Sequence, residues 1–268
     1  MAIKIALQLG LIPGSTVADR QRWAADHGVE GIEISAGDYP PDQLDQARRD
    51  FEDSPVPIST VCGNTSFDFL DLDATKRLAS IEASAAYLRF CGQVGAVGQI
   101  VPPIFGGRRL PDLSPLHDAA ELEMLMLGEV CRHLGDIAGE AGTLLLLEPL
   151  NRYEQHLLRR LDHAVDACRR IKHPAVKMMA DFFHMSIEET NTSRAIRRAK
   201  GWLSHVHLAD NTRLEPGSGD LNFLPAFRAL AAIDYSGYLA YECGLSETSS
   251  DTPLIHSIEY VRGLLTRL

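Results

Sequence analysis

Four side chains that commonly bind metal ions stand at the ends of four consecutive β-rich apolar runs. Glu148 follows four leucines, Asp181 follows Met-Met-Ala, His207 follows a valine, and Glu242 follows Ala-Tyr. A single carboxylate after a buried strand is more often a solvated loop residue or a helix cap. Solubility does not require one such residue in each of four successive runs, so their joint occurrence predicts one shared site.

Three carboxylates and one imidazole form an oxygen-rich donor set. Such a set suits a hard or borderline divalent cation that keeps open positions for a substrate, unlike the closed thiolate shell of a structural zinc. Carboxylates crowded around one point also repel one another unless a cation lies between them. We therefore expect one divalent metal ion, with Mn²⁺ as the first choice and Co²⁺ or Mg²⁺ as alternatives.

The elements that must position this site are eight short β-rich runs with helical patterns between them. The runs cover residues 3–9, 31–35, 57–63, 97–103, 143–149, 176–182, 203–210 and 238–243. A doubly wound open sheet usually has fewer strands and a G-x-G-x-x-G motif after the first, whereas here the first run leads into QLGLIPGST. The alternation predicts an α/β fold, a single (β/α)8 TIM barrel that spans residues 1–268 as one domain.

Helix signals support the same alternation. Residues 73–94 begin at Asp73, a candidate N-cap, and residues 115–140 would have Ser114 as their cap and Pro115 in the first helical position. Residues 252–268 carry apolar residues at roughly helical spacing, which predicts a last helix that packs against the first strand.

Active sites of such barrels lie at the C-terminal ends of the strands. Residues in the loops that follow the strands are therefore further candidates for the active site. Adjacent strands are about 4.8 Å apart, so four neighbouring strand ends can reach one ion. Glu154, His184 and Arg213 lie in loops directly after ligand-bearing strands, where they can contact a substrate. For Arg213 a place on the surface is the alternative.

Two more polar residues should point into the barrel. His205 shares a face of its strand with His207, one layer deeper, because successive side chains alternate between the two faces. A histidine hydrogen-bonded inside the lumen is favoured there over a metal ligand. Glu33 lies between two isoleucines in GIEIS and points inward if they pack outward, which predicts a supporting role.

Composition narrows the class of protein. The chain has 268 residues, 45% of them hydrophobic, and 36 acidic against 26 basic residues, for a formal net charge of −10. Without a basic block it is not expected to bind nucleic acid. No apolar run approaches the roughly 18 residues of a membrane span, and no signal peptide is recognisable. We interpret the five scattered cysteines as small apolar residues in a protein of the reducing cytoplasm.

Four segments resemble the D-tagatose 3-epimerase branch of the xylose-isomerase-like barrels. They are EPLNRYE at 148–154, DFFHM at 181–185, HVHLADNTR at 205–213 and YEC at 241–243. The resemblance implies that Glu148, Asp181, His207 and Glu242 bind the metal and that Glu148 and Glu242 also act as the acid/base pair. It places Glu154, His184 and Arg213 at the substrate, and it implies a homo-oligomer, either a dimer or a tetramer.

The resemblance implies inversion of the carbon next to a ketone (C3) through an enediolate, with a ketose or a keto-sugar acid as the small-molecule substrate. PPIFGGRRLPD after the fourth run and PGSGD at 216–220 resemble the subgroup that acts on keto-sugar acids or related polyol metabolites. An aldose–ketose isomerase of hydroxypyruvate-isomerase type and an inosose-type dehydratase remain alternatives. A zinc phosphodiesterase like the abasic-site endonucleases is disfavoured by the acidic charge and by the single four-ligand set. A binding barrel with a metal site and no turnover is a further, less favoured alternative.

Overall fold

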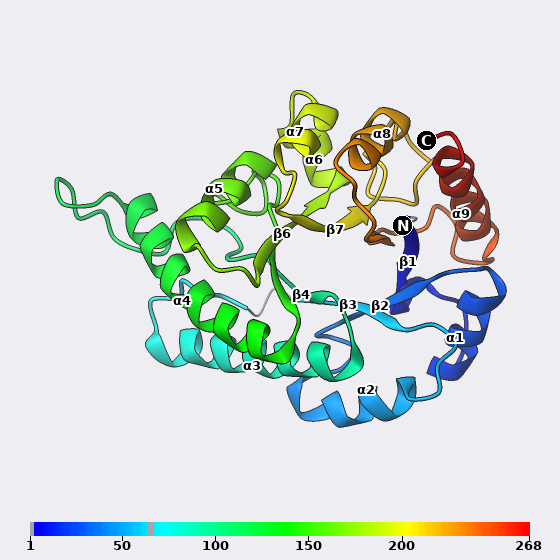
Figure 1. The fold of residues 1–268 in the computed structure, drawn as a ribbon, viewed down its shortest axis with the longest axis horizontal. Coiled ribbons are helices and arrows are strands. Elements are labelled where there is room, and N and C mark those ends of the chain that lie inside the picture. Colours follow the sequence, from blue (N-terminus) through cyan, green and yellow to red (C-terminus); the bar gives the residue numbers. More distant parts are fainter. Residues whose placement is uncertain (1–2, 64–66) are drawn as a thin grey trace.

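Eight parallel strands close into a barrel in chain order, with β8 paired to β1 (Figure 1). The computed structural model describes residues 3–63 and 67–268. Each expected run contains one strand, which confirms the predicted barrel. The strands are β1 (Lys4–Gln8), β2 (Gly31–Ser35), β3 (Ile58–Cys62), β4 (Gly98–Val101), β5 (Leu144–Leu147), β6 (Val176–Asp181), β7 (Leu203–Leu208) and β8 (Tyr238–Tyr241).

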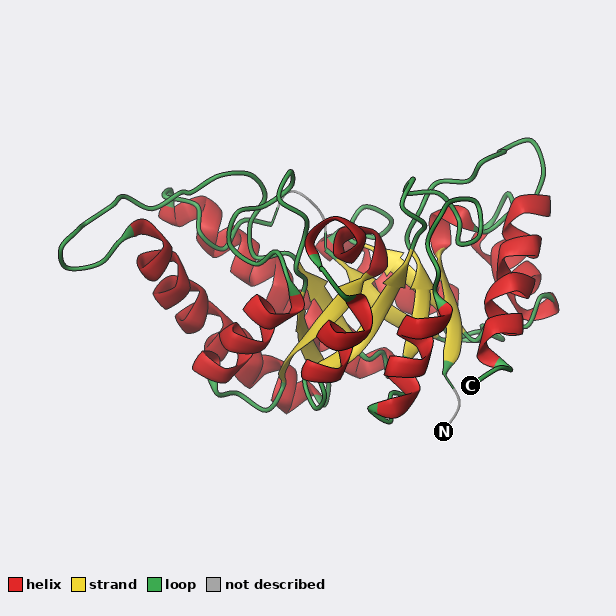
Figure 2. Ribbon diagram, turned by 90° about the horizontal axis from the view of Figure 1, so that it is seen from above, coloured by secondary structure: helices red, strands yellow, loops and turns green. Residues whose placement is uncertain are grey.

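Helices surround the strands on the outside, and long loops leave one end of the barrel (Figure 2). The α-helices are α1 (Val17–Asp26), α2 (Leu44–Phe51), α3 (Ala74–Val94), α4 (Ala119–Ala141), α5 (Leu161–Ile171), α6 (Phe182–Glu188), α7 (Thr192–Arg198), α8 (Leu224–Ala232) and α9 (Thr252–Leu265). Two short 3₁₀ turns are η1 (Leu9–Leu11) and η2 (Pro41–Gln43). Within the described residues, no helix combines the length and the apolar character needed to cross a bilayer.

Local sequence explains where α3 begins and ends. The Asp73 side chain accepts a hydrogen bond from the Thr75 backbone N–H at 2.8 Å, which confirms Asp73 as the N-cap. At the other end Gly95 has φ 70°, in the left-handed region that glycine adopts without strain.

The expected start of the next long helix was wrong. α4 begins at Ala119 and not at residue 115, and Ser114 and Pro115 lie in the loop before it. Asp118 and Glu121 form a capping box, in which each side chain accepts a hydrogen bond from the backbone N–H of the other residue. This reciprocal pair satisfies two helix-end donors and decides the boundary.

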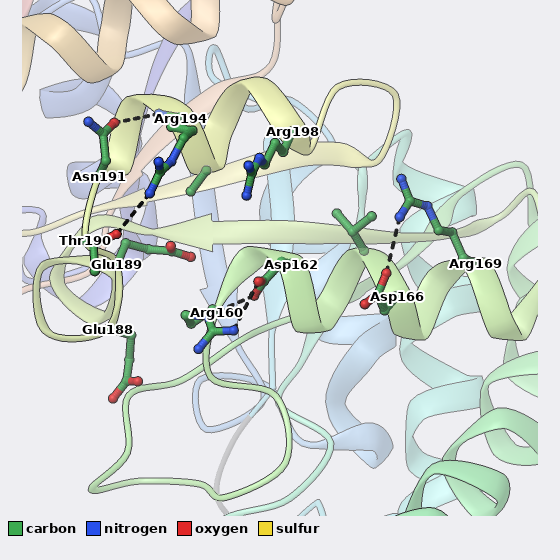
Figure 3. Close-up of a pocket in the computed structure, with 12 residues that line it drawn as sticks. Arg160, Asp162, Asp166, Arg169, Glu188, Glu189, Thr190, Asn191, Arg194 and Arg198 are labelled. Atoms are coloured by element: carbon green, nitrogen blue, oxygen red, sulfur yellow. Dashed lines mark hydrogen bonds and ion pairs between the residues drawn. The ribbon is translucent and has the colours of Figure 1, made fainter.

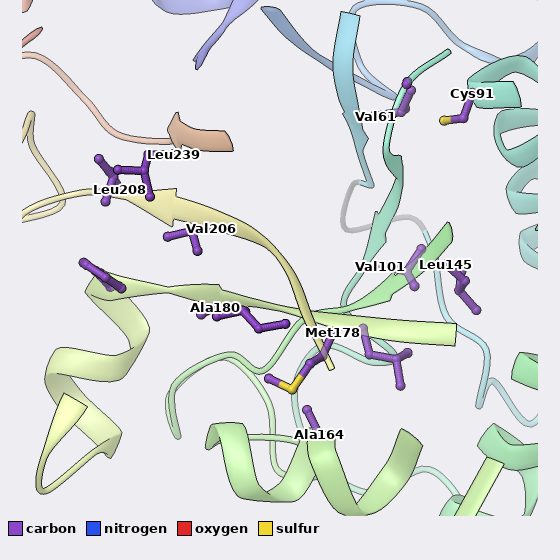
Figure 4. Close-up of a cluster of buried hydrophobic side chains, with 14 of the residues drawn as sticks. Val61, Cys91, Val101, Leu145, Ala164, Met178, Ala180, Val206, Leu208 and Leu239 are labelled. Carbon is purple, nitrogen blue, oxygen red and sulfur yellow. The ribbon is translucent and has the colours of Figure 1, made fainter. Parts of the chain in front are cut away.

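The main apolar core lies between the barrel wall and the helices. Alternation along β7 sends Val206 and Leu208 outward into this core (Figure 4), while His205 and His207 face the lumen and are 0% exposed. A smaller lumenal cluster consists of Cys62, Ile100, Leu146 and Met179. The outward side chains therefore hold the helices in place, and the inward ones build the interior of the barrel.

The last helix packs largely as its spacing predicts. Leu254, Ile258 and Val261 of α9 are buried in the same core as Ile5 and Leu7 of β1. The helix ends at Leu265 and not at the last residue of the chain. Ring closure itself comes from the pairing of β1 with β8.

Candidate metal centre and active site

The structure brings the four metal-ligand candidates together at the C-terminal ends of β5 to β8. In the parallel ladder Asp181 is the register partner of His207, and His207 is the partner of Ala240, two residues before Glu242. One donor atom from each of Glu148, Asp181, His207 and Glu242 lies within 4.8 Å of the others. We call these four residues the acidic cluster.

The imidazole of His207 sits at the centre of the acidic cluster. Its Nδ1 atom is 3.1 Å from Glu242 Oε2, 3.6 Å from Glu148 Oε1 and 3.8 Å from Asp181 Oδ2. Three of the four residues are almost fully buried, and only the Glu242 side chain is partly exposed, at 21%. The carboxylates therefore face one another where water screens them poorly.

Two buried atoms of the acidic cluster suggest what it is built to hold. Among the described residues, neither His207 Nδ1 nor Glu148 Oε1 has a hydrogen-bond partner. On the other side of the ring, His207 Nε2 lies 2.9 Å from Glu33 Oε1. A carboxylate accepts hydrogen bonds, so Nε2 carries a proton, and Nδ1 is the nitrogen that can bind a cation in place of a second proton. Carboxylate oxygens and one imidazole nitrogen fit a divalent cation.

The charges around His207 also favour a cation at this site. Burial alone would lower the pKa of His207, but the neighbouring Glu33 and Glu242 carboxylates outweigh it and raise that pKa well above its usual value. The surroundings of this imidazole thus favour positive charge strongly.

The two glutamates of the acidic cluster have different electrostatic surroundings. Burial raises the pKa of Glu148, and the contact with His207 offsets only part of this effect. Burial would also raise the pKa of Glu242, but His207 and Arg213 outweigh it and hold that pKa below its usual range. Neighbouring carboxyl groups held at different pKa values are typical of acid/base sites.

A supporting layer lies directly beneath the acidic cluster. Glu33 is 0% exposed and accepts hydrogen bonds from Thr60 Oγ1 at 2.6 Å and from His205 Nε2 at 3.0 Å. Burial alone would raise the pKa of Glu33, but His207 and His205 outweigh it and hold it well below the usual value. His205 is therefore a hydrogen-bonded lumenal histidine, and Glu33 points inward, both as predicted.

Two further contacts from the first strands reach the acidic cluster itself, and sequence reasoning missed both. Gln8 Nε2 donates to Glu33 Oε1 at 3.1 Å and to Glu242 Oε1 at 3.2 Å. The Cys62 thiol lies 3.6 Å from Glu242 Oε1. All five cysteines are free, but Cys62 is more than a small apolar residue. Gln8 and Cys62 are the last residues of β1 and β3, and their side chains face the lumen. The alternation of inward and outward side chains along each strand could have identified them.

Arg213 is a half-buried neighbour of the acidic cluster. Its Nη1 donates to Asp181 Oδ2 at 2.6 Å, and its Nη2 donates to Glu242 Oε2. The guanidinium also stacks over the Phe183 ring, 4.7 Å from its centroid. Arg213 adopts a left-handed backbone conformation, with φ 61°, which is uncommon for a residue with a side chain. The loop after β7 thus directs this side chain toward the cluster and away from the outer surface.

His184 and Glu154 form a second group beside the acidic cluster. The buried His184 places Nε2 3.8 Å from Asp181 Oδ2. Glu154 is more exposed and lies 3.7 Å from His184 Nδ1. Between them stands Asn151, a residue that sequence reasoning did not single out, although it belongs to the EPLNRYE segment.

A separate cavity of about 520 Å³ lies between α5 and α7, lined by charged side chains (Figure 3). Its arginines largely bond within the lining. Arg160 contacts Asp162 at 3.0 Å, and Arg169 contacts Asp166 at 3.2 Å. This surface feature is built from the helices, whereas the acidic cluster is built from strand ends.

Comparison with known proteins places this site in a family. Residues 21–264 match the family model described as the xylose isomerase-like TIM barrel, so the chain belongs to that family. Over 247 residues it is 32% identical to the 3-dehydro-D-guloside 4-epimerase of Escherichia coli K12, covering 90% of this chain and 92% of that protein.

A further relative and one solved structure are also sugar epimerases. D-psicose 3-epimerase from Enterocloster bolteae is 42% identical over 111 residues, 41% of this chain and 37% of that protein. The crystal structure of the 3-keto-D-glucoside 4-epimerase from E. coli superposes with a TM-score of 0.85 at 28% identity, covering 98% of this chain and 99% of that one. The resemblance found in the sequence is confirmed, as is the expected class, because these relatives are isomerases that act on carbohydrates.

Proposed function

We propose that this protein is a divalent-metal-dependent sugar epimerase that inverts the carbon next to a ketone. The observation that carries the proposal is the acidic cluster, in which carboxylate oxygens of Glu148 and Glu242 lie 3.6 and 3.1 Å from Nδ1 of His207. Glu148, Asp181, His207 and Glu242 would hold the ion, with Mn²⁺ as the first choice and Co²⁺ or Mg²⁺ as alternatives. When bound, the ion supplies a Lewis acid that makes the proton beside the carbonyl more acidic.

Glu148 and Glu242 are the proposed proton-transfer groups. One carboxylate removes the proton from the carbon beside the ketone, and the other group returns a proton to the opposite face of the resulting enediolate. Arg213 and His184 both border Asp181 and can donate hydrogen bonds to the substrate oxygens where negative charge develops. Glu154 stands behind His184 at the outer edge and would contact a substrate hydroxyl.

We propose a 3-keto-glycoside as the substrate, inverted at C4. Of the two relatives compared by sequence above, the 3-dehydro-D-guloside 4-epimerase aligns with nearly the whole chain, whereas the D-psicose 3-epimerase aligns with less than half of it. A free ketose inverted at C3 is the second candidate, and the higher identity of that shorter segment supports it. In both cases the inverted carbon lies next to the ketone, so the same residues serve either substrate.

Incubation in heavy water separates these possibilities. The metal-loaded protein is mixed with a methyl 3-keto-glucoside or with D-psicose, and the products are followed by NMR. Deuterium at C4 of the glycoside, with inverted configuration, supports the first proposal, and deuterium at C3 of the ketose supports the second. Label at a terminal carbon indicates an aldose–ketose isomerase, and loss of water indicates a dehydratase. Epimerised product without solvent label would reject the two-base mechanism.

The proposal also covers the cellular location and the assembly of the protein. We propose a cytoplasmic enzyme, which the five free thiols support. We also propose that each chain folds as one domain and that the chains assemble into a dimer or a tetramer. Light scattering of the purified protein measures the assembly directly.

A further inference from the structure

We infer that Asn151 is a positioning residue that fixes the tautomer of His184, keeping the ring proton on Nε2 so that this nitrogen donates to a substrate oxygen. The inference concerns the site of the proposed epimerase and rests on that function for its catalytic meaning. The tautomer itself is a property of the protein alone.

The backbone of Asn151 supplies the first argument. Its N–H donates to His184 Nδ1 at 3.2 Å, a contact between two residues that are each about 2% exposed. A backbone N–H has no acceptor role, so Nδ1 must offer its lone pair. In a neutral imidazole the proton then resides on Nε2.

The Asn151 side chain adds a second donor to the same nitrogen. Its Nδ2 lies 2.8 Å from His184 Nδ1 and donates to Glu154 Oε1, also at 2.8 Å. The amide cannot be turned round without losing a bond, because its Oδ1 accepts from the Tyr153 backbone N–H at 2.9 Å. Asn151 therefore presents donors on the side that faces His184.

The other side of the imidazole faces the reacting centre. His184 Nε2 lies 3.8 Å from Asp181 Oδ2, too far for a hydrogen bond. Arg213 Nη1 contacts the same Asp181 oxygen at 2.6 Å. The Nε2–H of His184 and the guanidinium of Arg213 thus approach one carboxylate, at the edge where a ketone oxygen would bind.

The chemical consequence is a donor that is already oriented before substrate arrives. A neutral histidine that polarises a carbonyl through one N–H is an established way to stabilise an enediolate. With Nδ1 held by Asn151, the ring spends no free energy on changing its tautomer during the reaction.

Nitrogen-15 NMR of the intact protein labelled at histidine tests the inference without turnover. We expect the His184 ring, assigned by loss of its signals in His184→Gln, to show an unprotonated Nδ1 and a protonated Nε2. A proton on Nδ1 in the wild-type protein would overturn the inference. This measurement does not depend on the stability of any Asn151 variant or on the identity of the sugar.

The Asn151→Asp variant tests the inference by kinetics, because it places a carboxylate acceptor where the amide donates to His184 Nδ1. The carboxylate then competes with the backbone N–H of residue 151 for Nδ1 of His184. We expect the fraction of His184 rings that carry their proton on Nδ1 to rise, and kcat/KM to fall about 10–100-fold, mostly in kcat, at unchanged metal content. Asn191→Asp is the matched control, since Asn191 caps α7 and its side chain, within the described part of the chain, bonds only its own helix, where it accepts from the Arg194 N–H at 2.8 Å. An unchanged His184 spectrum and unchanged kcat in Asn151→Asp would refute the role. If wild-type protein exchanges no proton on either keto-sugar, the proposed function fails while the tautomer is still tested.

Discussion

The two halves of the barrel contribute to the acidic cluster in different ways. β5 to β8 supply its four members at their C-terminal ends: Glu148, Asp181, His207 and Glu242. The first three strands supply an amide, a carboxylate, a hydroxyl and a thiol around or beneath it: Gln8, Glu33, Thr60 and Cys62. The second half of the barrel provides the candidate metal ligands, and the first half orients two of them, His207 and Glu242.

This difference explains why the halves differ in how easily they are recognised in sequence. Metal ligands must be particular residue types at particular strand ends, so they leave a pattern. A supporting contact needs only a hydrogen-bond donor or acceptor of suitable reach, which many residue types provide. Substitution of a ligand should therefore abolish turnover, whereas substitution of a supporting residue should change metal affinity and stability.

Removal of the metal should have the largest effect. Exhaustive chelation is expected to abolish turnover and to lower the melting temperature, because an ion that binds only the folded protein stabilises it by about 2.7 kcal/mol at a hundredfold excess over Kd. Elemental analysis, calorimetry and activity after adding back Mn²⁺ measure this. Full activity in protein shown to contain no metal would remove the basis of the comparison.

Glu148→Gln and Glu242→Gln should each reduce turnover by about 10²–10⁴-fold or more, since a positioned proton-transfer group contributes that much. Heavy-water exchange monitored by NMR, together with metal content, distinguishes the loss of a base from the loss of a ligand. In a variant that keeps its metal, exchange should survive from one epimer only. Equal residual exchange from both epimers would argue against a two-base mechanism.

Glu33→Gln should weaken metal affinity about 10–100-fold, because an amide holds the His207 ring less firmly than the carboxylate that now accepts its Nε2–H at 2.9 Å. Titration of apo-protein with Mn²⁺ measures the change. Glu30→Gln is the control, with the same substitution at an exposed position beside β2. Equal affinities in the two variants would show that the first half does not orient His207.

Gln8→Leu should have the smallest effect of the four. It removes two hydrogen bonds to carboxylates that keep other partners, so we expect a loss of about 1 kcal/mol in unfolding free energy and a change in metal affinity below about tenfold. Urea unfolding and Mn²⁺ titration measure both, with the exposed Gln46→Leu as the reference. A complete loss of metal binding would place Gln8 among the residues that define the site.

Much of the fold follows from the sequence, because burial on both faces of a parallel barrel produces short apolar runs that are easy to recognise. The start of α4 was missed because Pro115 suits a first helical turn on its own, whereas the capping box of Asp118 and Glu121 determines where the helix begins. Gln8 and Cys62 were missed because their partner, Glu242, lies far away along the chain and is brought close only by ring closure.

Ring closure also has a kinetic consequence. β1 pairs with β8 through Lys4 and Tyr238 and the residues that follow them, and Gln8 contacts Glu242 across 234 positions of sequence. Contacts of such long range form late in folding, since the chain must first lose the entropy of bringing its ends together. β5 to β8 pair as direct neighbours, whereas Gln8 reaches Glu242 only when the barrel closes. The full affinity for the ion should therefore appear only at this last step of refolding.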